Sequence, residues 1–353
     1  MSRPSATWTR LTSSNRLQRS SHALSIVESK VFIFGGELTP RQPVDSQLDV
    51  IDLKVSANGK RCQFMSSTDP SDQPHAATVE TLPAPSLVPS PRVGTASAVL
   101  NGDIYIFSGR GGIAMDAIDE GGKLWRYSPS ETAWSVVELA FPDNPAPAPR
   151  SYYAMTSDGI SKIYVHAGCP VQGRLSDLWA FDTHTCEWKE LPPAPAPPRG
   201  GTSITFSGGK IYRMGGFDGK SEQGGSIDVY DVAKESWESI VFSAGQDSPE
   251  ARSVAALLVV KVRNKDTLVT MFGERDPSAL GHAGAGKMLG DVWAFDIEEK
   301  VWCKVEVEGE APAPRGWFDA DVMRSSDGDA VIVHGGLAED NSRLGDVWKL
   351  VIV

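Results

Sequence analysis

One stretch of the sequence, residues 274–286, gathers side chains that could bind a metal ion. Glu274, Asp276 and His282 lie within nine residues of each other, and the glycines that follow allow tight folding of the backbone. Two carboxylates and one neutral imidazole suit a divalent ion such as Fe(II), Mn(II) or Zn(II) with open positions for a substrate. An alternative stays open, in which Asp276 caps a turn before Pro277 and His282 only hydrogen-bonds the loop.

The elements that must position this loop form a repeat. Six times along the chain a short apolar run ends in glycine, at residues 31–36, 104–109, 163–168, 211–216, 268–273 and 331–336. The runs are mostly roughly 45 to 70 residues apart, which is the range of kelch-type propeller blades at about 50 residues each. The candidate metal loop follows the fifth copy.

Two further landmarks recur in register with these runs. A tryptophan follows an aspartate by six residues in three copies, from Asp182 to Trp188, Asp231 to Trp237 and Asp296 to Trp302. An arginine precedes every run, at Arg19, Arg92, Arg150, Arg199, Arg252 and Arg315. Each copy therefore predicts four short strands, a to d: the arginine opens strand a, the glycine closes b, and the tryptophan lies on d.

A lone four-stranded sheet buries too little surface to be stable, so neighbouring blades must pack face to face. The sequence predicts an all-β, six-bladed kelch-type propeller with four antiparallel strands per blade, formed by one domain over residues 1–353. Trp8 has the context of a d strand, which indicates that the N-terminal strand completes the last blade and removes a sheet edge. The expected ranges are 13–68, 92–140, 148–192, 198–242, 251–307 and 314–353 plus 5–12, with a linker insertion over 66–91 that is rich in Ser, Pro, Thr and Asp.

Strand direction assigns the loops to faces. In an up-and-down blade the b-to-c loops and the d-to-a connections emerge on the same face. The b-to-c loops are longer and chemically richer than the short a-to-b turns. We therefore expect any functional site where these loops converge.

The stretch from Glu274 to Gly286, together with an Ala-Pro-Arg-Gly-Trp segment ending at Trp317, resembles the plant specifier proteins. These are the nitrile-specifier, epithiospecifier and thiocyanate-forming proteins, which are kelch propellers, and the resemblance extends over most of the chain. The family's iron motif is Glu, three residues, Asp, three residues, His. Glu274 and His282 match the outer spacing, whereas Ser278 stands at the middle position and Asp276 comes two residues early.

The resemblance implies that Glu274, Asp276 and His282 bind Fe(II). It also implies that Arg110, Arg174, Tyr152 and Trp317 line the pocket beside the metal. By their chemistry the two guanidinium groups could hold a sulfate-like or carboxylate leaving group, and the two aromatic rings could form an apolar wall. Core packing is the alternative for Trp317, and ion pairs with neighbouring loops are the alternative for the arginines.

Composition narrows the classes of partner. A net charge of -11 argues against nucleic acid or an anionic membrane as the main partner, and no apolar stretch is long enough to span a bilayer. The four cysteines have no metal-ligand spacing, and the N-terminus lacks the pattern of a signal peptide. We therefore expect a cytoplasmic protein with reduced thiols.

Two classes of function follow. In the first, the resemblance implies a lyase or isomerase, with Fe(II), that directs a reactive small molecule such as a glucosinolate aglucone, or another secondary metabolite, toward one product. In the second, the propeller is a non-catalytic scaffold whose loop face binds another protein, and its acidic surface favours a basic partner. Neither a Ser-His-Asp set nor a nucleotide-binding fingerprint is visible in the sequence.

Overall fold

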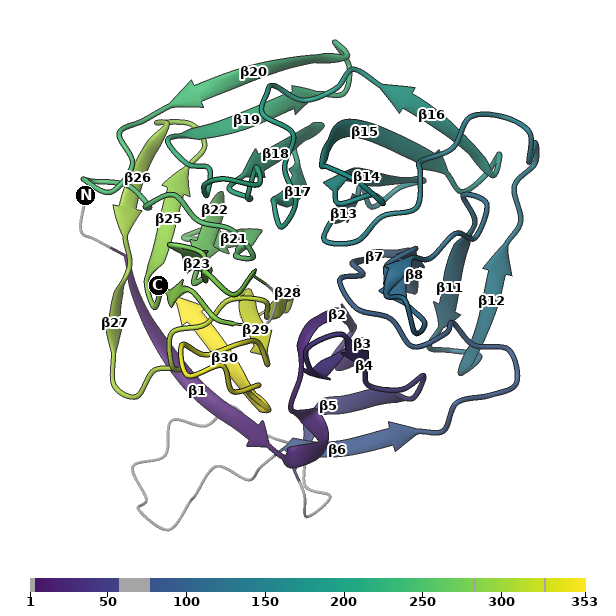
Figure 1. The fold of residues 1–353 in the computed structure, drawn as a ribbon. Helices are drawn as coiled ribbons and strands as arrows, with labels where there is room; N and C mark the ends of the chain where they lie inside the picture. Colours follow the sequence, from purple (N-terminus) through teal and green to yellow (C-terminus); the bar gives the residue numbers. More distant parts are fainter. Residues whose placement is uncertain (1–3, 57–76, 282–283, 327) are drawn as a thin grey trace.

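The computed structural model describes residues 4–56, 77–281, 284–326 and 328–353. Six antiparallel sheets stand in a ring around a central axis, and the chain passes through them in sequence order (Figure 1). The all-β, six-bladed propeller expected from the repeats is confirmed.

Each blade has four main strands, the first next to the axis and the fourth at the periphery (Figure 1). Blade one consists of β2 (Ser20–Val27), β3 (Lys30–Thr39), β5 (Leu48–Ser56) and β6 (Ala77–Leu82), and blade two of β7 (Ser97–Leu100), β8 (Asp103–Phe107), β11 (Leu124–Ser128) and β12 (Ala133–Val137). Blade three consists of β13 (Ala154–Ser157), β14 (Lys162–Gly168), β15 (Leu175–Asp182) and β16 (Glu187–Leu191), and blade four of β17 (Ser203–Ser207), β18 (Lys210–Met214), β19 (Ser226–Asp231) and β20 (Ser236–Val241). Blade five consists of β21 (Ala256–Val262), β22 (Lys265–Met271), β25 (Val292–Asp296) and β26 (Val301–Lys304).

The sixth blade joins the two ends of the chain. Its inner strands are β28 (Asp319–Met323), β29 (Ala330–His334) and β30 (Asp346–Ile352), and its outer strand is the N-terminal β1 (Ser5–Ser13). β1 pairs antiparallel with β30 from Ala6 opposite Ile352 to Ser13 opposite Asp346, and the short β27 (Glu306–Glu308) adds a parallel strand outside β1. The predicted closure of the ring by the N-terminal strand is therefore confirmed.

The first blade extends further along the chain than its sequence suggests. Composition predicts a linker over 66–91, yet β6 lies inside that range and pairs with β5 as the outer strand of blade one. The alternating burial of β6 is typical of a strand with one covered face, but the surrounding Ser, Pro and Thr obscure this short pattern in the sequence. Residues 57–76, which include the expected end of the blade at 68, lie outside the described part of the chain.

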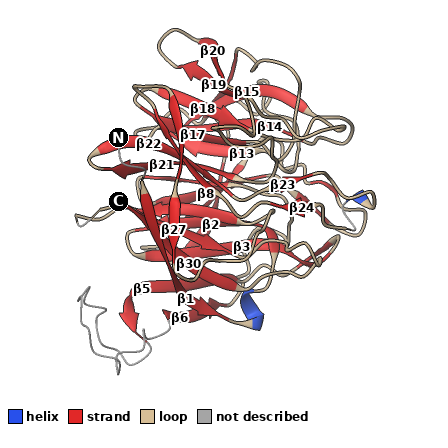
Figure 2. Cartoon of the chain, turned by 90° about the vertical axis from the view of Figure 1, so that its left-hand side faces the viewer, coloured by secondary structure: helices blue, strands red, loops and turns tan. Residues whose placement is uncertain are grey.

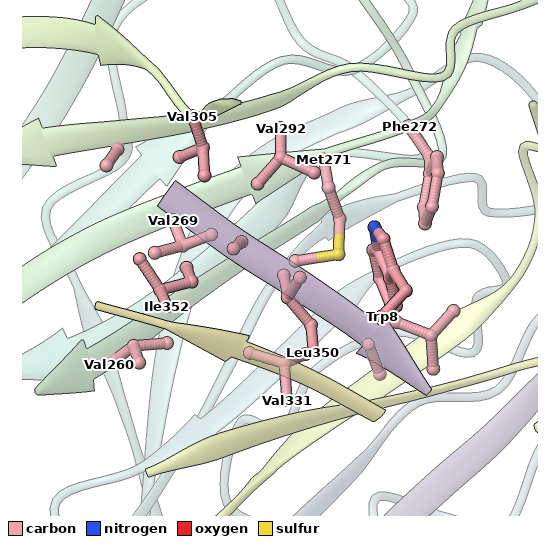
Figure 3. Packing of buried hydrophobic residues seen from close by; sticks show 14 of the residues in the cluster. Trp8, Val260, Val269, Met271, Phe272, Val292, Val305, Val331, Leu350 and Ile352 are labelled. Carbon is pink, nitrogen blue, oxygen red and sulfur yellow. The ribbon is translucent and has the colours of Figure 1, made fainter. Parts of the chain in front are cut away.

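The apolar core is divided among the interfaces between blades. Six clusters of buried side chains each draw on two neighbouring blades. The repeated tryptophans pack onto the preceding blade: the ring centroid of Trp134 lies 5.2 Å from that of Phe34, and that of Trp8 lies 5.7 Å from that of Phe272. Figure 3 shows Trp8 beside Phe272 and Met271 in the interface between blades five and six.

The six recurring arginines fasten the blades to one another. Their guanidinium groups are buried, and each donates to a carbonyl at the end of strand b, as Arg315 does to Gly335 at 2.9 Å. In five blades the same guanidinium also pairs with a carboxylate, from Asp49, Glu120, Asp177, Asp291 or Asp346. The backbone carbonyl of each arginine accepts the N–H of a b-strand glycine in the preceding blade, as Arg92 does from Gly36 at 2.9 Å.

Candidate functional site

Six equivalent residues mark where the b-to-c loops meet the d-to-a connections. In each blade the residue after the b-strand glycine pairs with the residue after the recurring arginine. The longer loops, together with β23 (Glu274–Arg275) and β24 (Lys287–Met288), lie on one side of the disc (Figure 2). We call these six residues the loop-face ring: Glu37, Arg110, Cys169, Phe217, Glu274 and Leu337.

A second ring of residues surrounds the axis itself. Its backbone N–H groups each donate to the carbonyl of the next member, at 2.7 to 3.2 Å, until the circle closes, and all of its members have left-handed φ values between 46° and 63°. We call this the axial ring: Ser21, Gly94, Tyr152, Gly201, Val254 and Trp317. Because the other four members are smaller, the rings of Tyr152 and Trp317 reach each other from opposite blades, with centroids 5.3 Å apart in an edge-to-face contact.

The axial ring separates the loop face from a central channel. The channel has a cavity volume of about 580 Å³ and is lined by the first strands of all six blades, with Tyr152 and Trp317 among its lining residues. Asp319 and Asp321 of β28 also line it, and they accept the N–H groups of Leu24 and Ile26 in blade one at 2.6 and 2.8 Å. Enclosure in the channel raises the pKa of Asp319 to about 7 and that of Asp321 to about 6.

Two arginines lie around Cys169 on the side of blades two and three. Burial raises the pKa of the Cys169 thiol, and the positive charges of Arg174 and Arg110 oppose this shift. The Nε atoms of both arginines are buried without a hydrogen-bond partner, and neither arginine forms an ion pair with any residue that the structure describes. The alternative of a structural ion pair, left open for both arginines by the sequence, finds no support among these residues.

Tyr152 lies between this basic side and the centre of the face. Burial raises the pKa of its hydroxyl, and the negative charge of Glu37 adds to this shift while Arg110 opposes it. Glu37 itself accepts hydrogen bonds from the Arg41 N–H at 2.7 Å and from Arg343 Nη2 at 3.2 Å. The Glu37 charge is therefore already engaged, unlike the charges on Arg110 and Arg174.

The opposite side of the face, at blades four and five, is acidic. Burial raises the pKa of Glu274 to about 7, and the nearby Glu222 adds to the shift, while hydrogen bonds from the Gly286 N–H and the Trp317 side chain lower it. The Gly286 N–H lies 2.7 Å from Glu274 Oε1. Trp317 thus contacts both Tyr152 and Glu274, so its ring belongs to the loop face as well as to the packing of the axis.

The expected metal ligands are only partly brought together. Glu274 is buried beneath the loop, but the side chain of Asp276 is 66% exposed and lies 3.7 Å from Lys287 Nζ. His282 lies outside the described residues, and the described part of the chain contains no group of three His, Cys, Asp or Glu side chains with metal-binding geometry. Of the three expected ligands, the described residues include only Glu274 and Asp276, so Fe(II) binding stays a prediction.

Some residues of this face were not identified in the sequence, namely Cys169, Phe217, Glu222 and Arg343. Cys169 and Phe217 occupy the same repeat position as Arg110 and Glu274. A comparison of the six copies at that one position would have found them. Glu222 and Arg343 lie deeper in loops of unequal length, where the repeat register gives no guide.

Comparisons with known proteins agree with this architecture. Within the described residues, no helix is long and apolar enough to cross a bilayer. The chain is 25% identical, over 95% of its length and 92% of the relative's, to N-(sulfonatooxy)prop-2-enimidothioate sulfolyase of Thlaspi arvense. It is also 27% identical to host cell factor 1 of Rattus norvegicus and of Homo sapiens, over 70% of this chain but only 12% of those proteins.

The resemblance to plant specifier proteins is confirmed, because a specifier-type relative matches nearly the whole chain. A family model described as the KLHDC2/KLHL20/DRC7 Kelch-repeats domain matches residues 21–273, from the first strand of blade one to the glycine that ends strand b of blade five. With six kelch blades and a family match over most of its length, this chain belongs to the Kelch-repeat family of KLHDC2, KLHL20 and DRC7.

Proposed function

We propose that the protein is a specifier-like lyase that acts on a small organic sulfate at its loop face. The observation that carries this proposal is the pair Arg110 and Arg174, two half-buried cations without an ion-pair partner among the described residues. The name of the Thlaspi relative, a sulfolyase with a sulfonatooxy substrate, supports the same chemistry.

The arginines suit the departure of sulfate. When an N–O bond to a sulfonate group breaks heterolytically, the oxygen keeps the electron pair and the leaving group changes from a singly to a doubly charged anion. Guanidinium groups that are not already neutralised stabilise this developing charge more than they stabilise the starting ester. Tyr152 and Trp317 would form the apolar floor for the remainder of the substrate.

Binding of Fe(II) by Glu274, Asp276 and His282 is a separate prediction. It can be tested by metal analysis of protein purified anaerobically with Fe(II), repeated on Glu274→Ala and His282→Ala. Bound iron that is lost in both variants would support the site. Absence of iron, or iron retained in both variants, would refute it.

The lyase proposal is tested by product analysis. A thioglucosidase would release the reactive aglucone from an allyl glucosinolate, with and without this protein, and products and sulfate would be quantified. We expect a product distribution that depends on the protein, and about 10- to 100-fold lower activity in Arg110→Ala and Arg174→Ala, because charge-assisted hydrogen bonds are lost. Arg41→Ala, which removes an exposed charge from the same face, serves as the control and should retain activity. An unchanged product distribution would contradict the proposal.

A second candidate function, a protein-binding scaffold, is favoured by a different observation. Four exposed aliphatic side chains lie at the end of β3 or in the b-to-c loops: Leu38, Ile113, Val171 and Leu280. Host cell factor 1 shares the kelch repeats, and an acidic chain would favour a basic partner. If this is the function, a double variant Ile113→Asp with Leu280→Asp should lose a partner that the wild-type protein captures under native conditions. A partner retained by both forms would argue against this surface.

A further inference from the structure

We infer that Phe217 and Gly219 position the guanidinium of Arg174 for anion binding. This inference rests on the proposed function, because it concerns one of the two arginines assigned to the sulfate group. Arg174 belongs to the b-to-c loop of blade three, whereas Phe217 and Gly219 belong to that of blade four. The guanidinium carbon lies 4.9 Å from the centroid of the Phe217 ring.

Gly219 leaves room for the guanidinium group of Arg174. A Cβ atom built on Gly219 would lie 2.7 Å from Arg174 Nη1, which is closer than real Cβ atoms approach other heavy atoms. Gly219 also has a φ of 105°, a conformation that side chains disfavour. A side chain at residue 219 would therefore push the guanidinium of Arg174 out of its present position against this loop.

The acidic neighbour in this loop does not neutralise the arginine. Asp218 uses its Oδ1 to accept the N–H groups of Lys220 and Ser221 at 2.7 and 2.9 Å, and it forms no ion pair with Arg174. The positive charge of Arg174 lowers the pKa of Asp218 but is only a minor cause of that shift. The Asp218 carboxylate is therefore used within its own loop, and the Arg174 guanidinium contacts the Phe217 ring instead.

An aromatic contact restrains the cation differently from a carboxylate. The ring attracts the positive charge electrostatically but accepts no conventional hydrogen bond, so the N–H donors remain available for a ligand. Phe217 is itself fixed, because its backbone N–H and carbonyl pair with Gly200 at 2.8 and 3.0 Å in the loop-face ring. The cation is held in place and keeps its full charge, as an anion site requires.

The experiment is a calorimetric titration with inorganic sulfate at constant ionic strength. Wild-type protein is compared with Phe217→Leu, Phe217→Tyr and Gly219→Ala. We expect about 3- to 10-fold weaker sulfate binding for Phe217→Leu and Gly219→Ala, and near wild-type binding for Phe217→Tyr, which keeps the aromatic face. Phe206→Leu is the matched control: Phe206 also lies in blade four and stacks on Tyr164 of blade three, and its replacement should leave sulfate binding unchanged.

Two further variants separate this inference from the proposed function. If Arg174→Ala and Arg110→Ala abolish sulfate binding while Phe217→Leu and Gly219→Ala do not weaken it, the positioning role is refuted and the anion site stands. If neither arginine variant affects sulfate binding, the anion site itself is refuted. Should Phe217→Leu fail to fold, as judged by circular dichroism, Gly219→Ala still decides between these outcomes.

Discussion

Single side chains in the channel should make the stability of this protein depend on pH. The pKa of Asp319 is about 7 in the folded protein, above its ordinary value of 3.8 in an unfolded chain. Between about pH 4 and pH 7 the folded state therefore binds more protons than the unfolded state. The stability that Asp319 contributes is lost as the pH rises through this range.

Asp319→Asn removes this dependence and keeps an oxygen that can accept the Leu24 N–H. We expect the free energy of unfolding of the variant, relative to wild type, to improve between pH 5 and pH 8, as measured by urea denaturation at both pH values. A difference that is constant with pH would show that Asp319 does not titrate in this range. Adding Asp321→Asn should enlarge the effect, since the pKa of Asp321 is also raised.

At the same scale, glycines that look alike in the sequence have unequal roles. Gly36 and Gly102 both have positive φ values, 89° and 82°, but a Cβ on Gly36 would lie 2.7 Å from the Ser20 carbonyl oxygen, whereas a Cβ on Gly102 meets nothing within 4 Å. We expect Gly102→Ala to cost about 1 kcal/mol from backbone strain and Gly36→Ala clearly more. Equal losses in thermal denaturation would contradict the steric explanation.

Among the elements, β1 joins the sixth blade to its neighbour as well as completing it. Trp8 is only 6% exposed and packs on Phe272 of blade five, so Trp8→Ala should destabilise the protein by about 3 to 5 kcal/mol. Chemical denaturation measures this loss. Trp8→Phe, which keeps an aromatic ring in the same interface, should recover much of it.

The elements also show which features of this fold a sequence can predict. Glycine and arginine recur because every blade places them in the same contacts, and a tryptophan lies on the outer strand of every blade but the first. Repetition therefore reveals the strands, and Trp8 reveals the closure. The strand β6 is missed because its alternation is short and lies in a polar segment. The positions of Arg110 and Glu274 follow from the repeat register, whereas the outward turn of Asp276 toward Lys287 depends on loop geometry that spacing does not determine.

On the scale of the whole molecule, the ring has one seam that is closed by distant parts of the chain. β1 pairs with β30 inside blade six. Asp319 and Asp321 accept N–H groups from the first strand of blade one, and the Ser21 N–H donates to the Trp317 carbonyl, so side-chain and backbone contacts join blades one and six. We expect a variant that lacks residues 1–13 to expose the edge of β30 and to aggregate or unfold at a much lower temperature. Light scattering and calorimetry would test this, and a stable monomer with unchanged melting behaviour would contradict it.

The loop-face ring has a consequence for how such proteins can diversify. Each of its six residues stands in the same backbone setting, yet in this chain they are a glutamate, an arginine, a cysteine, a phenylalanine, a second glutamate and a leucine. The scaffold thus presents six equivalent positions around the axis, and each carries a different side chain or repeats only the glutamate. Exchanging one of these residues changes the chemistry of the loop face at one blade, while the backbone pairing that holds the position is the same in all six.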